Sequence, residues 1–211
     1  MNTMPRFRDV IRTEAALREV VGEASQIVWD KEIARVDEHC RRFIARSPFV
    51  LIATRGASGL VDISPKGDPA GFVRVLDEVT VAIPDRLGNR RMDTYRNVIG
   101  NPDVGLIFLI PGVRDTLRVS GKGEIVRDAD LRATMAVKGR APDLVLVVHV
   151  ERTFFHCTKC MVRSSLWDPS GWPDTAGLSS SAEALFAHAQ PDATVQDMQT
   201  LIEDDIKERL Y

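Results

Sequence analysis

The sequence predicts a mainly β domain with flanking helices, organised as an antiparallel barrel. From Phe49 onward, short segments rich in β-branched residues alternate with Gly, Pro and Asp, a pattern typical of strands and turns. Several connections are only long enough for a hairpin, for example Leu76-Asp77-Glu78. A doubly wound parallel sheet would need a helix after nearly every strand, and this region has only one clear helical pattern. We therefore expect a barrel over about residues 48–165.

The N-terminal part, about residues 1–46, is expected to be a helical extension of the barrel. Residues 10–22 form a weak helical pattern. A stronger pattern follows Asp30, a suitable N-cap, and Ser47-Pro48 ends it. The apolar residues of this second helix repeat along one face through Arg46, which predicts that the face lies on the core: Ile33, Val36, Cys40, Phe43 and Ile44.

The barrel region contains the following predicted strands: Phe49 to Thr54, Leu60 to Ile63, Gly71 to Val75, Val79 to Ile83, Val104 to Ile110, Thr116 to Val126, and Leu144 to His156. Two helices are expected between them, Arg91 to Ile99 and Asp130 to Val137. A helical tail is expected over about residues 179–211, where Thr194 to Asp197 has the pattern of a capping box.

Composition limits the possible functions. The 211 residues fit one domain with decorated ends, and 28 basic against 30 acidic residues give a net charge of -2. This balance does not favour a nucleic-acid partner. The sequence has no secretory signal at its start and no run of about 20 apolar residues, so we expect a cytoplasmic protein without a membrane partner.

Two adjacent arginines, Arg90 and Arg91, stand where a strand gives way to a helix. The preceding strand closes on Pro84-Asp85, and we expect both arginines in the first turn of the helix. A helix N-terminus offers free backbone N–H groups and a partial positive charge, so two guanidinium groups there would suit a phosphate. The alternative is that both are solvated surface charges.

The order of several motifs resembles the pyridoxamine 5'-phosphate oxidase-like flavoproteins. The motifs are Ser-Pro-Lys-Gly-Asp-Pro-Ala-Gly-Phe at residues 64–72, Ile-Pro-Asp at 83–85, Gly-Asn-Arg-Arg at 88–91, Asn-Pro-Asp-Val-Gly-Leu-Ile-Phe at 101–108, and Leu-Arg-Val-Ser-Gly-Lys-Gly-Glu at 117–124. The first of these is similar to a bacterial subgroup of the family. The match covers about residues 29–168 and implies a split β-barrel, an FMN cofactor, and a homodimer with the flavin at the subunit interface.

The resemblance also implies cofactor-binding residues. Arg90 and Arg91 match the pair that grips the FMN phosphate, and Asn89 stands where the enzyme proper commonly has serine, so it could contact the phosphate or cap the helix. Pro84 and Asp85 match the segment along the ribityl chain and phosphate.

Other matched positions concern the flavin ring. Ser64, Pro65 and Lys66 match the strand that approaches the isoalloxazine, although Lys66 could instead be a solvated loop lysine. Arg118 matches a strand that reaches the flavin, and an outward-facing strand arginine is the alternative.

The C-terminal part of the match is looser. Arg163 and Trp167 fall where relatives place an arginine and an aromatic residue near the flavin or substrate. The arginine- and histidine-bearing signature with which pyridoxamine phosphate oxidase itself holds its substrate is not recognisable in the sequence.

His156, Cys157 and Cys160 support a different interpretation. The Cys-x-x-Cys spacing is compatible with a redox pair or half of a zinc site, with His156 as a third ligand. Against zinc, the other cysteine, Cys40, lies on the apolar helix face. Three functions therefore remain open: an FMN-dependent oxidoreductase acting on an unknown small molecule, a non-catalytic flavin carrier or sensor, and a metal or dithiol protein.

Overall fold

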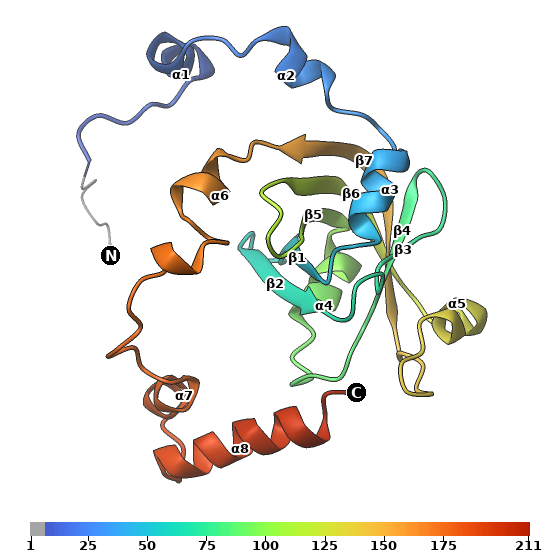
Figure 1. Cartoon of the computed structure of the whole chain (residues 1–211), viewed down its shortest axis with the longest axis vertical. Helices are drawn as coiled ribbons and strands as arrows, with labels where there is room; N and C mark the ends of the chain where they lie inside the picture. Colours follow the sequence, from blue (N-terminus) through green and yellow to red (C-terminus); the bar gives the residue numbers. More distant parts are fainter. Residues whose placement is uncertain (1–6) are drawn as a thin grey trace. The chain divides into compact units, whose positions relative to one another are not determined.

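The structure is a computed structural model that describes residues 7–211, which divide into two compact units at Glu32 and Ile33 (Figure 1). In the first unit, the described residues form α1 (Glu14–Val21) and α2 (Gln26–Asp30). The Thr13 side chain caps α1 by accepting a hydrogen bond from the Ala16 N–H at 3.2 Å. Neither helix has a buried residue.

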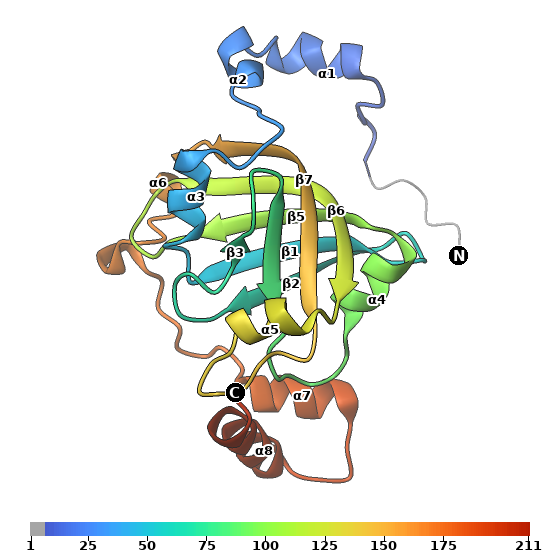
Figure 2. The same cartoon turned by 90° about the vertical axis from the view of Figure 1, so that its right-hand side faces the viewer.

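The second unit, Ile33–Tyr211, is built on one antiparallel sheet. Its strands are β1 (Phe49–Arg55), β2 (Val61–Gly67), β3 (Arg74–Val75), β4 (Thr80–Pro84), β5 (Asp103–Leu109), β6 (Thr116–Val126) and β7 (Val145–His156). They are hydrogen-bonded in the order β2-β1-β5-β6-β7-β4-β3 (Figure 2). This arrangement confirms the predicted mainly β fold and the split β-barrel.

The core follows from the alternation of side chains along these strands. In β1, every second residue points inward, so Val50, Ile52 and Thr54 are buried and the residues between them are less so. The interior strand β7 is buried continuously from Val145 to Val148, as expected for a strand covered on both faces. The barrel is therefore filled by side chains.

A β-bulge between Ser120 and Gly121 interrupts the pairing of β6 with β7. A Cβ atom at position 121 would collide with the backbone carbonyl of His149. Only glycine lets the two strands approach this closely, and the register shift leaves Glu151 of β7 as the extra residue, so the bulge allows β7 to bend while it remains paired with β6.

The first helix of this unit, α3 (Glu38–Ile44), begins later than the sequence predicts. Asp37, not Asp30, is its N-cap and accepts a hydrogen bond from the Cys40 N–H at 2.9 Å. Before it, the Ile33 N–H donates to the Thr153 carbonyl at 3.0 Å, and the Val36 N–H donates to the Glu78 carbonyl at 2.6 Å. These backbone hydrogen bonds, to β7 and to the turn between β3 and β4, keep residues 33–36 out of a helix, so the apolar pattern there does not belong to one.

The remaining helices follow individual strands of the sheet or belong to the tail. α4 (Asp93–Gly100) packs against β1, β2 and β6, and α5 (Ala129–Thr134) is shorter than predicted. The tail contains α6 (Lys159–Arg163), a short 3-10 helix (Pro169–Gly171), α7 (Ser181–Ala189) and α8 (Val195–Glu208). The capping box at Thr194 is confirmed, and α7 lies within the predicted helical tail, whereas α2 and α6 were not predicted as separate helices. Within residues 7–211, no helix combines the length and the hydropathy that crossing a bilayer requires.

Candidate functional site

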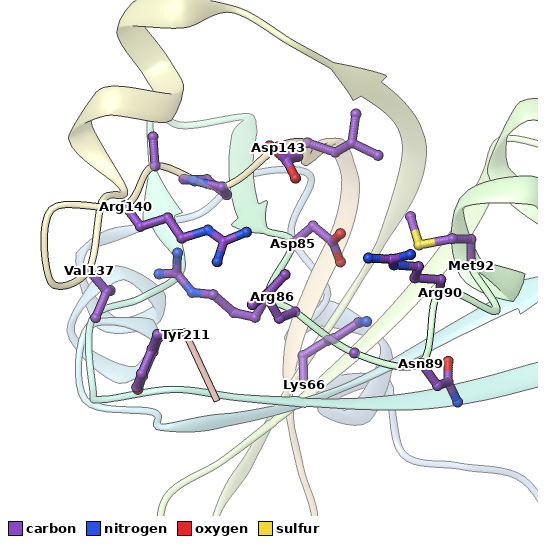
Figure 3. A pocket seen from close by; sticks show the side chains of 15 residues that line it. Lys66, Asp85, Arg86, Asn89, Arg90, Met92, Val137, Arg140, Asp143 and Tyr211 are labelled. Atoms are coloured by element: carbon purple, nitrogen blue, oxygen red, sulfur yellow. The ribbon is translucent and has the colours of Figure 1, made fainter. Parts of the chain in front are cut away.

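A cavity of about 360 Å³ lies beyond the end of β4 (Figure 3). Its walls come from the loop at residues 85–92, the hairpin at residues 137–144, Lys66 of β2, and Tyr211. Four basic residues, Lys66, Arg86, Arg90 and Arg140, line it together with the acidic Asp85 and Asp143. This volume is within the range of about 300–1,000 Å³ that is common for small-molecule sites.

The loop at residues 85–92 is shaped by hydrogen bonds and by two unusual backbone conformations. The Asp85 N–H donates to the Leu144 carbonyl at 3.0 Å, and the Asn89 side chain accepts from the Arg91 N–H at 3.0 Å. Arg90 and Met92 both have positive φ, 61° and 58°. Because left-handed residues interrupt helical geometry, α4 begins only at Asp93.

The prediction that the two arginines lie in the first helical turn is therefore wrong, as is the capping role considered for Asn89. Both arginines precede the helix, and Asn89 closes a local turn instead. Met92 occupies the N-cap position and has no side-chain capping bond. The positive charge that the loop at residues 85–92 brings to the cavity consequently comes from its side chains.

The structure also separates the two arginines. The Arg90 side chain extends toward Asp85 and the cavity (Figure 3). Arg91 is not among the cavity residues, and its guanidinium forms an ion pair with Asp93, which raises the pKa of Arg91. No acidic side chain among residues 7–211 forms an ion pair with Arg90 or Arg140. These two guanidinium groups are thus available to an anion in the cavity.

Asp85 has an unfavourable environment for a carboxylate. Burial raises its pKa, and this effect outweighs the nearby charge of Lys66 and the hydrogen bond from Tyr95, which act in the opposite direction. Tyr95 is itself buried, and burial together with Asp85 raises its pKa. The Lys66 ammonium lies 5.8 Å from the centroid of the Tyr95 ring. A carboxyl group with a raised pKa in a cavity is a frequent feature of functional sites.

A second set of contacts at the cavity wall was not predicted from the sequence. The Asp68 carboxylate accepts hydrogen bonds from Arg86 at 2.6 Å and from the Tyr211 hydroxyl at 2.7 Å. Arg86 also donates to the Met135 carbonyl at 3.0 Å. The Asp68 side chain is only 1% exposed, so this ion pair is largely removed from water. Asp68 lies within the motif at residues 64–72 and Arg86 directly follows the motif at residues 83–85, but their pairing across 18 residues has no periodic signal.

Some of the predicted residues support the site from outside the cavity. Pro84 is buried at the end of β4. Pro65 is exposed on β2, and Ser64 accepts a hydrogen bond from the Thr94 hydroxyl at 2.9 Å, which joins β2 to α4. Of the eight predicted residues from Ser64 to Arg91, four line the cavity: Lys66, Asp85, Asn89 and Arg90.

Arg118, Arg163 and Trp167 lie outside the cavity of the single chain. The Arg118 guanidinium is 5.3 Å from the centroid of the Phe154 ring. Arg163 is exposed on α6, and the Trp167 indole N–H donates to the Val113 carbonyl at 2.9 Å. In one chain, these residues form no common site with Arg90.

The alternative metal site gains no support from the geometry. Cys157 and Cys160 are exposed free thiols, and the Cys160 thiol lies 3.7 Å from the Cys157 carbonyl oxygen. Among residues 7–211, no cluster of three or more His, Cys, Asp or Glu side chains could hold a metal ion. Burial raises the pKa of the Cys40 thiol to about 12, as expected for a core cysteine.

Comparison with known proteins gives one family and several similar solved structures. The family model for pyridoxamine 5'-phosphate oxidase matches residues 36–157, which is more than half of the chain. No curated protein matches the sequence.

Three of the similar solved structures are described by their identity and coverage. HupZ from Group A Streptococcus is 21% identical, with a TM-score of 0.47 over 56% of this chain and 92% of its own. General stress protein 26 from Bacillus anthracis is 11% identical, with a TM-score of 0.43 over 54% and 88%. A Clostridium acetobutylicum protein of the pyridoxinephosphate oxidase family is 17% identical, with a TM-score of 0.41 over 56% and 85%.

Proposed function

Because the chain belongs to the pyridoxamine 5'-phosphate oxidase family, we propose that it is an FMN-binding flavoprotein and an FMN-dependent oxidoreductase acting on a small molecule. One observation carries this proposal. The Arg90 guanidinium, without an acidic partner among residues 7–211, faces a cavity of about 360 Å³ that Lys66 also lines.

The residues of the cavity suit the parts of FMN. Arg90 can hold the phosphate, because a guanidinium group forms strong charge-assisted hydrogen bonds to phosphate oxygens. Apolar side chains that could contact the ring system line the same cavity: Leu87, Met92, Val137, Pro142 and Leu144. Bound FMN would supply hydride or single-electron chemistry.

Lys66 and Asp85 provide charges of opposite sign within the cavity. In our proposal, the Lys66 ammonium approaches the ring and stabilises negative charge that develops there. Asp85 is the carboxyl group of the cavity whose burial favours the protonated form. Its raised pKa makes it suited to hold a proton beside the ligand.

We further propose a homodimer with the flavin at the subunit interface. The edge strand β2 exposes large apolar side chains, with Val61 66% and Ile63 62% exposed, and such a surface favours association. Arg118, Arg163 and Trp167 would then reach the flavin from the partner subunit. Light scattering of the purified protein measures this directly, and a monomer at micromolar concentration would contradict the dimer.

The function is tested by flavin binding to the purified protein. The absorbance spectrum, with mass identification of any released chromophore, shows whether FMN is bound, and quenching of FMN fluorescence gives its affinity. We expect Arg90→Ala to weaken binding more than Arg91→Ala, because only Arg90 faces the cavity and Arg91 is paired with Asp93. The two variants remove the same charge from adjacent positions, so each is the control for the other.

Two outcomes would contradict the proposal. If the folded wild-type protein binds no FMN, the chain is not an FMN flavoprotein. If FMN binds equally well to the wild type and to Arg90→Ala, the phosphate lies elsewhere. Reduction of the bound flavin by NAD(P)H, followed by reoxidation by an added acceptor, then distinguishes an oxidoreductase from a flavin carrier.

A further inference from the structure

The segment Arg209–Tyr211, which follows α8, is attached to the rim of the cavity. The Tyr211 hydroxyl donates to Asp68 at 2.7 Å, and the Lys138 ammonium lies 5.0 Å from the centroid of the Tyr211 ring. Arg209 donates to the Gly88 carbonyl at 2.9 Å. The three contacts therefore reach three segments around the cavity: Asp68 directly after β2, Lys138 in the hairpin at residues 137–144, and Gly88 in the loop that carries Arg90.

The acceptor for the Tyr211 hydroxyl is held in place independently of the segment. Asp68 is buried and paired with Arg86, which is itself fixed by the Met135 carbonyl. In Figure 3, Tyr211 stands beside Arg86 and Val137 at one end of the cavity, and Arg90 lies at the other. A rigid, charged acceptor makes the hydrogen bond from Tyr211 stronger than one between neutral groups.

Hydrophobic burial does little to hold this segment. α8 has no buried residue, and Ile206 and Leu210 are 61% and 58% exposed. The polar contacts of Arg209 and Tyr211 are consequently the principal attachment of the segment to the cavity. Such an attachment can open without disrupting the core, because few apolar contacts would be lost.

We propose that Arg209 and Tyr211 form a ligand-retaining strap, in which Tyr211 is a wall of the binding site and slows dissociation of the bound cofactor. This inference rests on the proposed function, since FMN is the ligand considered. It adds residues more than 110 positions beyond Arg90 in the chain to the binding site.

The first test measures FMN dissociation in three proteins. Tyr211→Phe removes the hydroxyl but keeps the ring, and we expect the dissociation rate constant to rise about tenfold, as for the loss of a hydrogen bond to a charged group. Leu210→Ala is the matched control, because it changes an exposed neighbour that does not line the cavity. Stopped-flow fluorescence after dilution into a flavin scavenger gives the rates.

The second test needs no ligand. In the ligand-free protein, hydrogen exchange of peptides covering residues 86–91 should be faster in a variant carrying Tyr211→Phe and Arg209→Gln than in Leu210→Ala. The strap loses its contacts with Asp68 and Gly88 in this variant, so the loop is less protected.

The outcomes distinguish the strap from the proposed function. The strap is supported if FMN is released faster from Tyr211→Phe but not from Leu210→Ala, and if hydrogen exchange is faster in the double variant. If the wild type binds FMN and neither quantity changes, the strap is wrong and the flavin site stands. If the wild type binds no FMN, the proposed function is wrong and so is the strap as a cofactor-retaining device, whereas the exchange data still show whether the segment covers the loop.

Discussion

The cavity rim and the corner between β7 and α6 contain similar residue types in different physical settings. At the rim, the side chains of Asp68 and Arg86 are 1% and 18% exposed. The residues that surround the cavity there are far apart in the chain, from Lys66 to Tyr211. At the corner, His156, Cys157 and Arg163 are exposed. The hydrogen bonds that Cys160 and Ser164 make there join residues three positions apart.

The difference shows where this fold can shift the pKa of its polar groups. Burial raises the pKa of Asp85 at the cavity, because distant parts of the chain converge there and exclude water. The corner is built by local turns and remains in contact with solvent. Substitutions of matched residues in the two regions test whether function follows this contrast.

The largest contrast is expected for two aspartates. Asp68→Ala should lower the free energy of unfolding by about 3 kcal/mol, because it leaves Arg86 partly buried without its carboxylate. Asp168→Ala, which removes an exposed cap from the short 3-10 helix, should have a much smaller effect. Urea denaturation of both variants measures the free energy of unfolding. Equal losses would show that Asp68 contributes no more to stability than Asp168 does.

The next contrast concerns two arginines and the affinity for FMN. Arg90→Ala should weaken binding about tenfold to a hundredfold, the effect of losing a hydrogen bond between charged groups. Arg163→Ala should weaken it only about threefold, because this guanidinium is exposed and could reach the flavin only from a partner subunit. Fluorescence titration compares them. A loss for Arg163→Ala as large as that for Arg90→Ala would place the α6 corner at the centre of the site.

A smaller effect is expected from Asp85 and depends on pH. Because burial raises the pKa of Asp85 in the folded protein, the folded state binds more protons than the unfolded state between the usual and the raised pKa. Its contribution to stability therefore falls as pH rises through this interval. Asp85→Asn should remove that fall and make the ligand-free protein more stable near neutral pH. Thermal unfolding from about pH 4 to pH 7 measures this, and a less stable variant at neutral pH would mean that attraction to Lys66 dominates.

The smallest effect is expected at the corner itself. Replacing both Cys157 and Cys160 with serine should leave flavin content unchanged and alter stability by no more than about 0.5 kcal/mol, as is usual for exposed positions. The measurement is the ratio of flavin to protein absorbance after purification. Loss of the chromophore in this variant would revive the dithiol hypothesis.

The strands were the part of the fold that the sequence predicted best. Thr116–Val126 has the predicted bounds, since the alternation of polar residues with apolar residues or glycine between residues 117 and 125 is a local signal. The helix expected after Asp30 was misplaced because apolar spacing cannot show that the Ile33 and Val36 backbones pair with the sheet. Such pairing depends on contacts distant in the chain.

The site could be predicted only in part for the same reason. Motif order located Lys66, Asp85, Asn89 and Arg90, which line one cavity. The sequence could not separate Arg90 from Arg91, because the separation depends on two left-handed residues and an ion pair with Asp93. Nor could it show the contact between Asp68 and Tyr211, which are 143 positions apart and belong to no common motif.

The bulge between β6 and β7 has a consequence for which substitutions this chain tolerates. Since any Cβ at position 121 would meet the His149 carbonyl, a library that randomises this codon should return glycine almost exclusively among well-folded clones. The neighbouring Lys122, exposed on the same strand, should accept most amino acids. The number of tolerated amino acids would therefore change abruptly between two adjacent codons. The cause is the short distance between the backbones of β6 and β7 at Gly121, and not a requirement of catalysis.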